Sequence, residues 1–257
     1  MKVGKNFAFH RIPNEYTMSM EYENATIQGV GVKTLTLLCT ALVTALFLIG
    51  IIVRVGYMPF FMYIIAAITT LVLQIIMNVS PTKAKHLAIP YAISEGLVVG
   101  CLCGLLELVL PDMGLQLAGV ALLITLAVFI GGTILYAKGY IQVGRKFKSF
   151  LIIVSLGILI FSFFFSIMAL VMFLVNRVNL YSMFYMSGLG LVCSIVMCII
   201  ASMYVIVSLA NADEMIESGA SKVYEWFAAY AITLNVIYLF IEVLRLVLII
   251  VSRSREK

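Results

Sequence analysis

The sequence predicts an all-α integral membrane protein built as a bundle of seven transmembrane helices. Hydrophobic residues make up 63% of the 257 residues and charged residues 11%, and the mean hydropathy is +1.14. In soluble domains, by contrast, about a quarter of the residues are charged. A helix needs roughly 20 predominantly apolar residues to cross the hydrocarbon core of a bilayer. Stretches of about this length predict seven crossings, at residues 32–53, 57–77, 86–110, 115–137, 149–175, 181–210 and 224–251.

Turn residues separate the first three crossings. Residues 54–57 contain Gly56 and predict a tight turn, so that the first two crossings form a hairpin. Pro59 falls in the first turn of the second helix, where its missing N–H group is tolerated. After the second crossing, Pro81 follows a polar segment and prevents the helix from continuing.

The third crossing differs from the others because it contains Glu95 and a row of glycines. Gly96, Gly100 and Gly104 recur every four residues and therefore lie on one face of a helix. Small residues at this spacing allow close approach of a second helix, so that van der Waals contact can drive association within lipid. We expect this face to be a helix-packing surface.

The later crossings are delimited by loops and polar residues. Residues 111–114 form the turn into the fourth crossing, and the fifth crossing is apolar on all sides. The sixth ends in a polar segment that contains Asp213, and Gly219 is the expected turn residue before the seventh. Trp226 lies at the start of the seventh crossing, where aromatic residues commonly mark a membrane interface.

The distribution of charge divides the chain and predicts its orientation. We expect a polar N-terminal tail (1–28), a seven-helix transmembrane domain (29–252) and a short basic C-terminal tail (253–257). The tail lacks an apolar segment with a small-residue cleavage site, so the first crossing should direct insertion. With the N-terminus in the cytoplasm, most of the 17 basic residues lie on the inner side, as the positive-inside rule favours.

Charged residues inside the crossings are the candidate functional residues, because each costs about 2.5–3.5 kcal/mol on insertion scales. Glu95 and Glu242 both lie well inside their crossings. Arg245 follows Glu242 by three positions, a spacing at which helical side chains can pair. Glu242 therefore has two interpretations: an ion pair that lowers the cost of insertion, or a group facing an internal cavity that responds to pH or binds a cation.

The residues that catalysis would require are missing from the crossings. His10 and His86 lie in the tail and at a helix entrance, and Asp112 and Asp213 lie in or beside loops. The sequence contains neither G-x-S-x-G nor H-E-x-x-H. The five cysteines lie inside apolar crossings and lack the spacing of a metal site or a disulfide framework. We therefore expect no enzyme, no cofactor and no nucleic-acid partner, and the sequence defines no metal ligands.

Three blocks of the sequence carry a resemblance to the Bax inhibitor-1 family, and specifically to its bacterial YccA-like branch. The blocks are Asn24-Ala25-Thr26-Ile27-Gln28-Gly29-Val30 with Lys33-Thr34-Leu35; Tyr91-Ala92-x-x-Glu95-Gly96-x-x-x-Gly100; and Gly219-Ala220-Ser221-Lys222 with Glu225-Trp226 and Tyr238-Leu239-x-x-Glu242-x-Leu244-Arg245-Leu246. The resemblance extends over nearly the whole chain.

This resemblance implies a seven-helix bundle whose last helix is central and enclosed by the other six. It also implies a pH-sensitive calcium-leak channel, with Ca²⁺ as the permeant ion, gated by acidic residues of the sixth and seventh helices. Carried over to this chain, the acidic positions of the third and seventh helices are Glu95 and Glu242. The sixth-helix positions fall on Ser208 and Ala210, which cannot titrate, and Asp213 is the nearest acid.

The resemblance leaves an alternative function open. Bacterial members of the family are linked to a membrane protease as modulators, so this chain is alternatively a non-conducting regulator. It would bind a membrane protease or another membrane protein through the glycine-lined third helix or the polar tail. The absence of acids at Ser208 and Ala210 favours this alternative. The bacterial branch implies a multi-pass protein of the plasma membrane.

Overall fold

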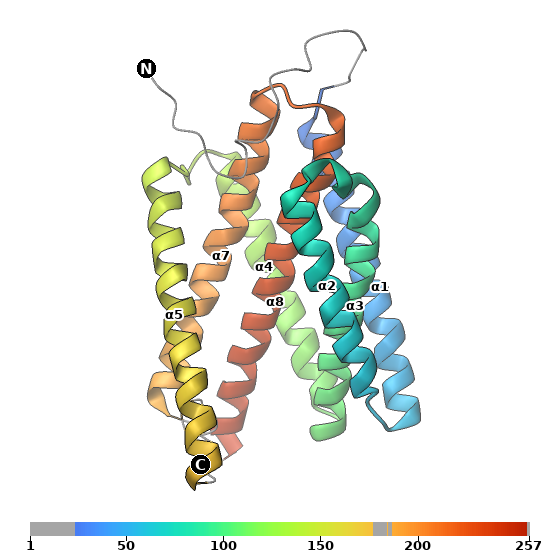
Figure 1. Ribbon diagram of the computed structural model, residues 1–257, viewed down its shortest axis with the longest axis vertical. Helices are drawn as coiled ribbons and strands as arrows, with labels where there is room; N and C mark the ends of the chain where they lie inside the picture. Colours follow the sequence, from blue (N-terminus) through green and yellow to red (C-terminus); the bar gives the residue numbers. More distant parts are fainter. Residues whose placement is uncertain (1–23, 177–183, 185–186, 256–257) are drawn as a thin grey trace.

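Seven long helices run side by side in the computed structural model, which describes residues 24–176, 184 and 187–255 (Figure 1). All seven are long and apolar enough to span a membrane, which confirms the predicted all-α, multi-pass fold. In chain order the helices are α1 (Ile27–Val55), α2 (Phe60–Val79), α3 (Ala84–Val109), α4 (Gly114–Ala137), α5 (Arg145–Asn176), α7 (Gly188–Glu217) and α8 (Glu225–Arg255), with short 3₁₀ helices η1 (Pro81–Lys83) before α3 and η2 (Lys222–Tyr224) before α8.

Capping residues, rather than the ends of apolar segments, determine where several helices begin and end. Thr26 caps α1, because its side chain accepts a hydrogen bond from the amide of Gly29, and α1 therefore begins five residues earlier than expected. Gly56 ends α1 in the left-handed conformation, with φ of 67°. Pro59 is the N-cap residue of α2 and not, as expected, part of its first turn. Residues 253–255, which were expected to belong to the C-terminal tail, form the last turn of α8.

Helix α8 runs through the middle of the bundle, as the resemblance implies (Figure 1). It packs against α1, α3, α4 and α7, whereas α2 packs mainly against α3 and α5 mainly against α7. The core around α8 is built largely from small residues, including Ala121, Ala201 and Ala228. Such side chains let helices approach closely, which favours association in lipid.

The glycine row of α3 is a packing surface, as the spacing predicts. A Cβ atom added at Gly96 would collide with the backbone oxygen of Ala41 on α1. At Gly100 it would lie 2.9 Å from the oxygen of Ala45, and at Gly104 it would lie 2.8 Å from Ile52. Because α1 already fills this face, the glycine row is not a surface for a partner protein, and that part of the regulator hypothesis is wrong.

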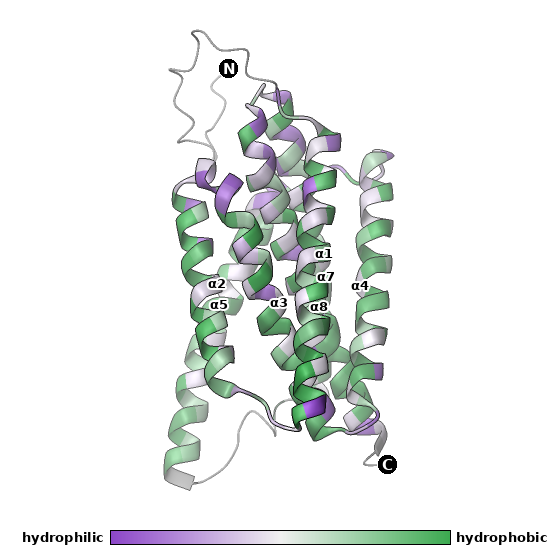
Figure 2. Ribbon diagram, turned by 90° about the vertical axis from the view of Figure 1, so that its right-hand side faces the viewer, coloured by the Kyte–Doolittle hydropathy of each residue, from purple (hydrophilic) through white to green (hydrophobic). Residues whose placement is uncertain are grey.

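The helices are hydrophobic along most of their length, and hydrophilic residues gather mainly at the end where α1 and α8 begin (Figure 2). Helix α5 is the least buried of the seven spans, and Phe161, Phe163 and Phe164 are all exposed on it. Large exposed apolar side chains over a bundle of this length are suited to contact with lipid. The molecule is therefore a multi-pass membrane protein that would lie in a bilayer.

Candidate functional site

Glu95 is buried inside the bundle, with 8% of its surface exposed. The Tyr91 hydroxyl donates a hydrogen bond of 2.8 Å to Oε1 of Glu95, and Nε2 of Gln74 on α2 lies 3.4 Å from the same oxygen. Tyr91 is itself fixed, because its ring meets Tyr230 of α8 edge to face with centroids 4.9 Å apart. Three helices, α2, α3 and α8, thus hold this carboxyl group in place.

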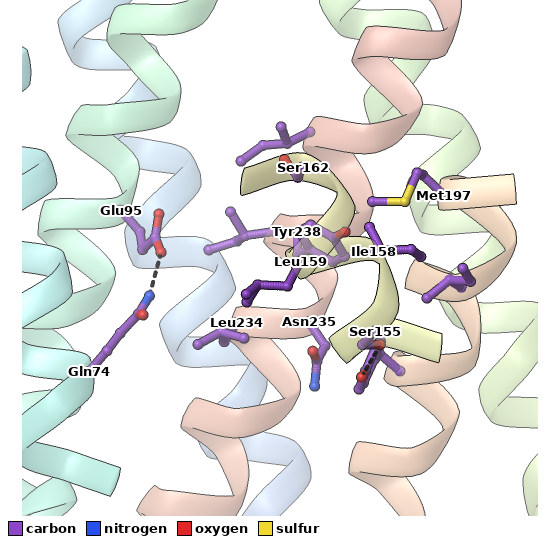
Figure 3. Close-up of a pocket in the computed structure, with 14 residues that line it drawn as sticks. Gln74, Glu95, Ser155, Ile158, Leu159, Ser162, Met197, Leu234, Asn235 and Tyr238 are labelled. Carbon is purple, nitrogen blue, oxygen red and sulfur yellow. Dashed lines mark hydrogen bonds between the residues drawn. The ribbon is translucent and has the colours of Figure 1, made fainter. Parts of the chain in front are cut away.

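A cavity of about 580 Å³ lies beside Glu95 and extends across α8 to α5 and α7 (Figure 3). Its polar lining residues come from five helices and are Gln74, Glu95, Ser155, Ser162, Tyr204, Asn235 and Tyr238. The hydroxyl groups of Ser155 and Tyr204 lie 2.5 Å apart and link α5 to α7. The remaining lining is mostly aliphatic, so the cavity is an apolar chamber with a few hydrogen-bonding groups.

Glu242 is more deeply buried than Glu95, with 2% of its surface exposed, and it is paired with Arg245. The guanidinium Nη1 donates to Oε2 at 3.1 Å and to Oε1 at 3.3 Å. The Arg245 side chain is 40% exposed, so the pair extends from the core towards the surface of the bundle. Of the two interpretations of Glu242, the ion pair along the helix is therefore the one present in this structure.

Glu95 and Glu242 do not share a cavity. Glu95 lines the chamber described above, whereas Glu242 is absent from its lining. Tyr238 lies between the two environments, because it lines the cavity and is also a neighbour of Glu242. On α7, the neighbour of Glu242 is Cys198. The two carboxylates therefore do not form one site around this cavity.

Asp213 lies too far along α7 to be a partner of Glu242. It follows Cys198, the neighbour of Glu242, by about 15 residues, which is about 22 Å at 1.5 Å per residue. Asp213 instead lies beside Tyr136 at the polar end of the bundle. Ser208 and Ala210 are both buried in α7. Glu242 thus has no carboxylate partner at these α7 positions.

The residue that sequence reasoning missed is Glu225, at the first position of α8, with 1% of its surface exposed. Its Oε1 accepts hydrogen bonds from the amide of Thr26 at 2.8 Å and from the Thr26 hydroxyl at 3.2 Å, and its Oε2 pairs with Lys33. A Cβ atom at Gly29 would overlap this carboxylate. The opposite charges of Lys33 and Glu225 were the only hint of this contact in the sequence. Nothing in the sequence indicated that the start of α1 lies beside the start of α8.

Backbone contacts reinforce the same junction. The amide of Ala25 donates to the carbonyl oxygen of Ala220 at 2.8 Å, and Asn24 and Ser221 form an isolated antiparallel bridge. The start of α1 is thereby attached to the loop before α8. Most of the polar tail expected at 1–28 lies outside the described residues, but residues 24–28 belong to this junction and to the first turn of α1.

The arrangement combines a buried acid in a largely apolar chamber, which also contains a few hydrogen-bonding groups, with a buried ion pair next to it. Within the described part of the chain, no group of three or more His, Cys, Asp or Glu side chains is placed to hold a metal ion. The chamber offers oxygen atoms from carboxylate, amide and hydroxyl groups. These are the groups that interact with hard cations and with hydrogen-bond donors.

Comparison with curated proteins gave no match, and comparison with solved structures gave none. The family model described as "Bax inhibitor 1 like" matches residues 6–252, which is nearly the whole chain. The match includes all three sequence blocks noted above and every helix of the bundle but for the last turn of α8. The chain therefore belongs to the Bax inhibitor 1 like family of membrane proteins.

Proposed function

We propose that this protein is a cation-permeable channel, specifically a calcium leak of the kind implied by its family, and that Ca²⁺ is the permeant ion. The observation that carries the proposal is Glu95, a carboxyl group held beside a cavity that contains further hydrogen-bonding groups, inside a membrane-spanning bundle. An ionisable group at such a place is costly and is commonly associated with an ion pathway. The protein acts without catalysis and without a cofactor.

The charge of the cavity supports passage of a cation. No lysine, arginine or histidine is among the residues that line it in the described part of the chain. Within the described residues, the negative charge of Glu95 is therefore balanced by the dipoles of Tyr91 and Gln74. A cation entering the cavity is attracted to this carboxylate, and the oxygens of Asn235 and Tyr204 replace part of its hydration shell.

The Glu242–Arg245 pair acts as the gate. The groups around the Glu242 carboxylate are Arg245 and Tyr238 on α8 and Cys198 on α7. Protonation of Glu242 removes its charge and hence its attraction to Arg245. Because Tyr238 also lines the cavity, movement of the released pair reaches the chamber through that side chain. Acidification therefore opens the pathway.

The protein functions in the plasma membrane of a bacterium, with its N-terminus in the cytoplasm. Lys33, Lys148 and Lys222 all lie at the end of the bundle where α1, α5 and α8 begin. An excess of lysine and arginine on one side favours retention of that side in the cytoplasm.

The test is Ca²⁺ flux into liposomes that contain the purified protein, compared at pH 6 and pH 8. We expect the wild type to carry Ca²⁺ faster at pH 6, and Glu95→Gln to reduce the flux at least tenfold. Glu217→Gln is the matched control, because it makes the same change at an exposed carboxylate at the end of α7. A wild type that carries no Ca²⁺ at either pH, or a Glu95→Gln variant with unchanged flux, would contradict the proposal.

The alternative function is a non-conducting regulator that binds a membrane protease or another membrane protein. It is favoured by the pairing of Glu242 with Arg245 and by the absence of acids at Ser208 and Ala210. With the glycine row filled by α1, the polar tail is the remaining surface of that hypothesis. Capture of the same membrane protein by the full chain but not by a chain lacking residues 1–23, together with absent Ca²⁺ flux, would favour the regulator.

A further inference from the structure

The cavity beside Glu95 also has the features of a binding site for an organic cation. We propose that it binds a single-chain amphiphile with a primary ammonium head group, which enters from the membrane. The ammonium group pairs with Glu95, and the alkyl chain lies along the aliphatic wall formed by α5 and α8. Binding of this kind does not require the protein to conduct ions.

The free oxygen of Glu95 is the anchor for the head group. Tyr91 and Gln74 both donate to Oε1, and no donor to Oε2 is recorded among the described residues. In Figure 3 the second oxygen of Glu95 is turned away from Gln74. The lining contains no basic side chain in the described part of the chain, so a ligand must supply the positive charge. A charge-assisted hydrogen bond from N⁺–H to a carboxylate is among the strongest in proteins.

A second lining residue presents another unused acceptor. Asn235 donates from Nδ2 to the carbonyl oxygen of Ala231 at 3.0 Å, which leaves its Oδ1 without a recorded donor within the described residues. A primary ammonium group has three N–H donors and no acceptor, so it matches a site that presents acceptors. A phospholipid amine matches less well, because its phosphate would bring a negative charge close to Glu95 without a basic residue to balance it.

A metal ion would be held less well than an ammonium ion. Calcium sites use about six to eight oxygen ligands at about 2.3–2.6 Å. The lining supplies one carboxylate, and no cluster of three or more His, Cys, Asp or Glu side chains occurs in the described parts of the chain. A Ca²⁺ ion can therefore pass through the chamber without being retained, whereas an ammonium ion needs only two or three acceptors.

The apolar part of the ligand fits the side of the cavity that faces the membrane. Helix α5 contributes Ile158 and Leu159, and α8 contributes Leu234 and Ile241. Leu159 is 64% exposed, and α5 packs mainly against α7 rather than against α2, so this wall is incomplete towards lipid. The volume of about 580 Å³ falls within the range of about 300–1,000 Å³ that is typical of small-molecule sites.

The experiment measures binding of dodecylamine to the purified full-length chain in neutral detergent by native mass spectrometry, with dodecanol as the uncharged analogue. We expect one dodecylamine to bind per chain in a saturable manner, and dodecanol to bind at least tenfold more weakly. Glu95→Gln should weaken dodecylamine binding at least tenfold, whereas Glu217→Gln, which removes the same charge at an exposed site, should leave it unchanged.

A second variant keeps the test decisive if Glu95→Gln does not fold. Ser162 lines the cavity from an exposed position on α5, so Ser162→Trp should obstruct the opening without contact with the Tyr91–Glu95 hydrogen bond. We expect it also to weaken dodecylamine binding at least tenfold. Equal affinity for dodecylamine and dodecanol, unchanged binding in both cavity variants, or no saturable binding to the wild type would overturn the proposal. None of these results depends on Ca²⁺ flux.

Discussion

In the proposed mechanism Glu242 carries the pH dependence, because the sixth-helix positions that the resemblance assigns to acids are Ser208 and Ala210 in this chain. A carboxylate pair that shares a proton titrates in two coupled steps. Ser208 and Ala210 on α7 cannot titrate and so give Glu242 no such partner, and the ion pair of Glu242 in the described part of the chain is with Arg245. Opening should therefore follow the uptake of a single proton.

Replacing Glu242 with glutamine should abolish the pH dependence of Ca²⁺ flux. Glutamine has the shape of the protonated acid and does not change its charge between pH 6 and pH 8, so the variant should carry Ca²⁺ at both pH values at the rate of the wild type at pH 6. Flux into proteoliposomes measured across this range checks the prediction. If the variant keeps the wild-type ratio of flux at the two pH values, Glu242 is not the gate.

At the first position of α8, Glu225 should hold the start of α1 in place. Glu225→Gln removes the ion pair with Lys33 and weakens the hydrogen bonds from Thr26, and hydrogen bonds to charged groups contribute about 1.5–3 kcal/mol each. We expect amide hydrogen exchange in residues 25–30 to accelerate at least tenfold, with no change in α4. Glu217→Gln serves as the control, and equal exchange in the two variants would contradict this role of Glu225.

At the scale of the elements, sequence reasoning predicted the existence of the helices better than their ends. Hydropathy places the sixth crossing at 181–210, but α7 extends from Gly188 to Glu217. Ser187 caps its start, and its polar end is held by Lys148 of α5, which donates to Asn211 at 2.8 Å and to Glu214 at 2.5 Å. A hydropathy pattern contains neither the cap nor the partner helix, so the shift was not predictable from it.

The contact between α1 and α3 should depend on the absence of a side chain at Gly96. Gly96→Ala places a methyl group against the backbone of Ala41, and overpacking of this kind typically costs about 1–3 kcal/mol. Gly119→Ala on α4 is the matched control, because no atom lies within 4 Å of the added Cβ there, and it should be neutral or stabilising by up to about 1 kcal/mol. Unfolding in detergent measures both changes, and equal stability of the two variants would refute the packing argument.

At the scale of the whole molecule, the arrangement of the two buried acids could not be deduced from their positions along the chain. Their depth was predictable, and so was the pairing of Glu242 with Arg245, since both depend on helical spacing alone. Which side of α8 faces α3 depends on how α8 is rotated about its own axis, and helical spacing alone does not determine this rotation. That rotation brings Tyr238 and Asn235 to the cavity and leaves Glu242 outside its lining.

The orientation of the bundle predicts which end is open to reagents outside the cell. Residue 217 is the last residue of α7, and residue 112 lies between α3 and α4 at the opposite end of the bundle. With the N-terminus in the cytoplasm, a membrane-impermeant maleimide should label a cysteine introduced by Asp112→Cys in intact cells and should not label one introduced by Glu217→Cys. The reverse pattern would place the N-terminus outside.

The central claim is that cations cross the bundle through the cavity beside Glu95. The most direct measurement is the reversal potential of the purified protein in a planar bilayer under a calcium chloride gradient. The wild type and Glu217→Gln should give a potential of the sign and size expected for a cation-selective pathway, and Glu95→Gln should shift it towards zero. A potential unchanged by Glu95→Gln, or a wild-type bilayer without conductance, would contradict the claim.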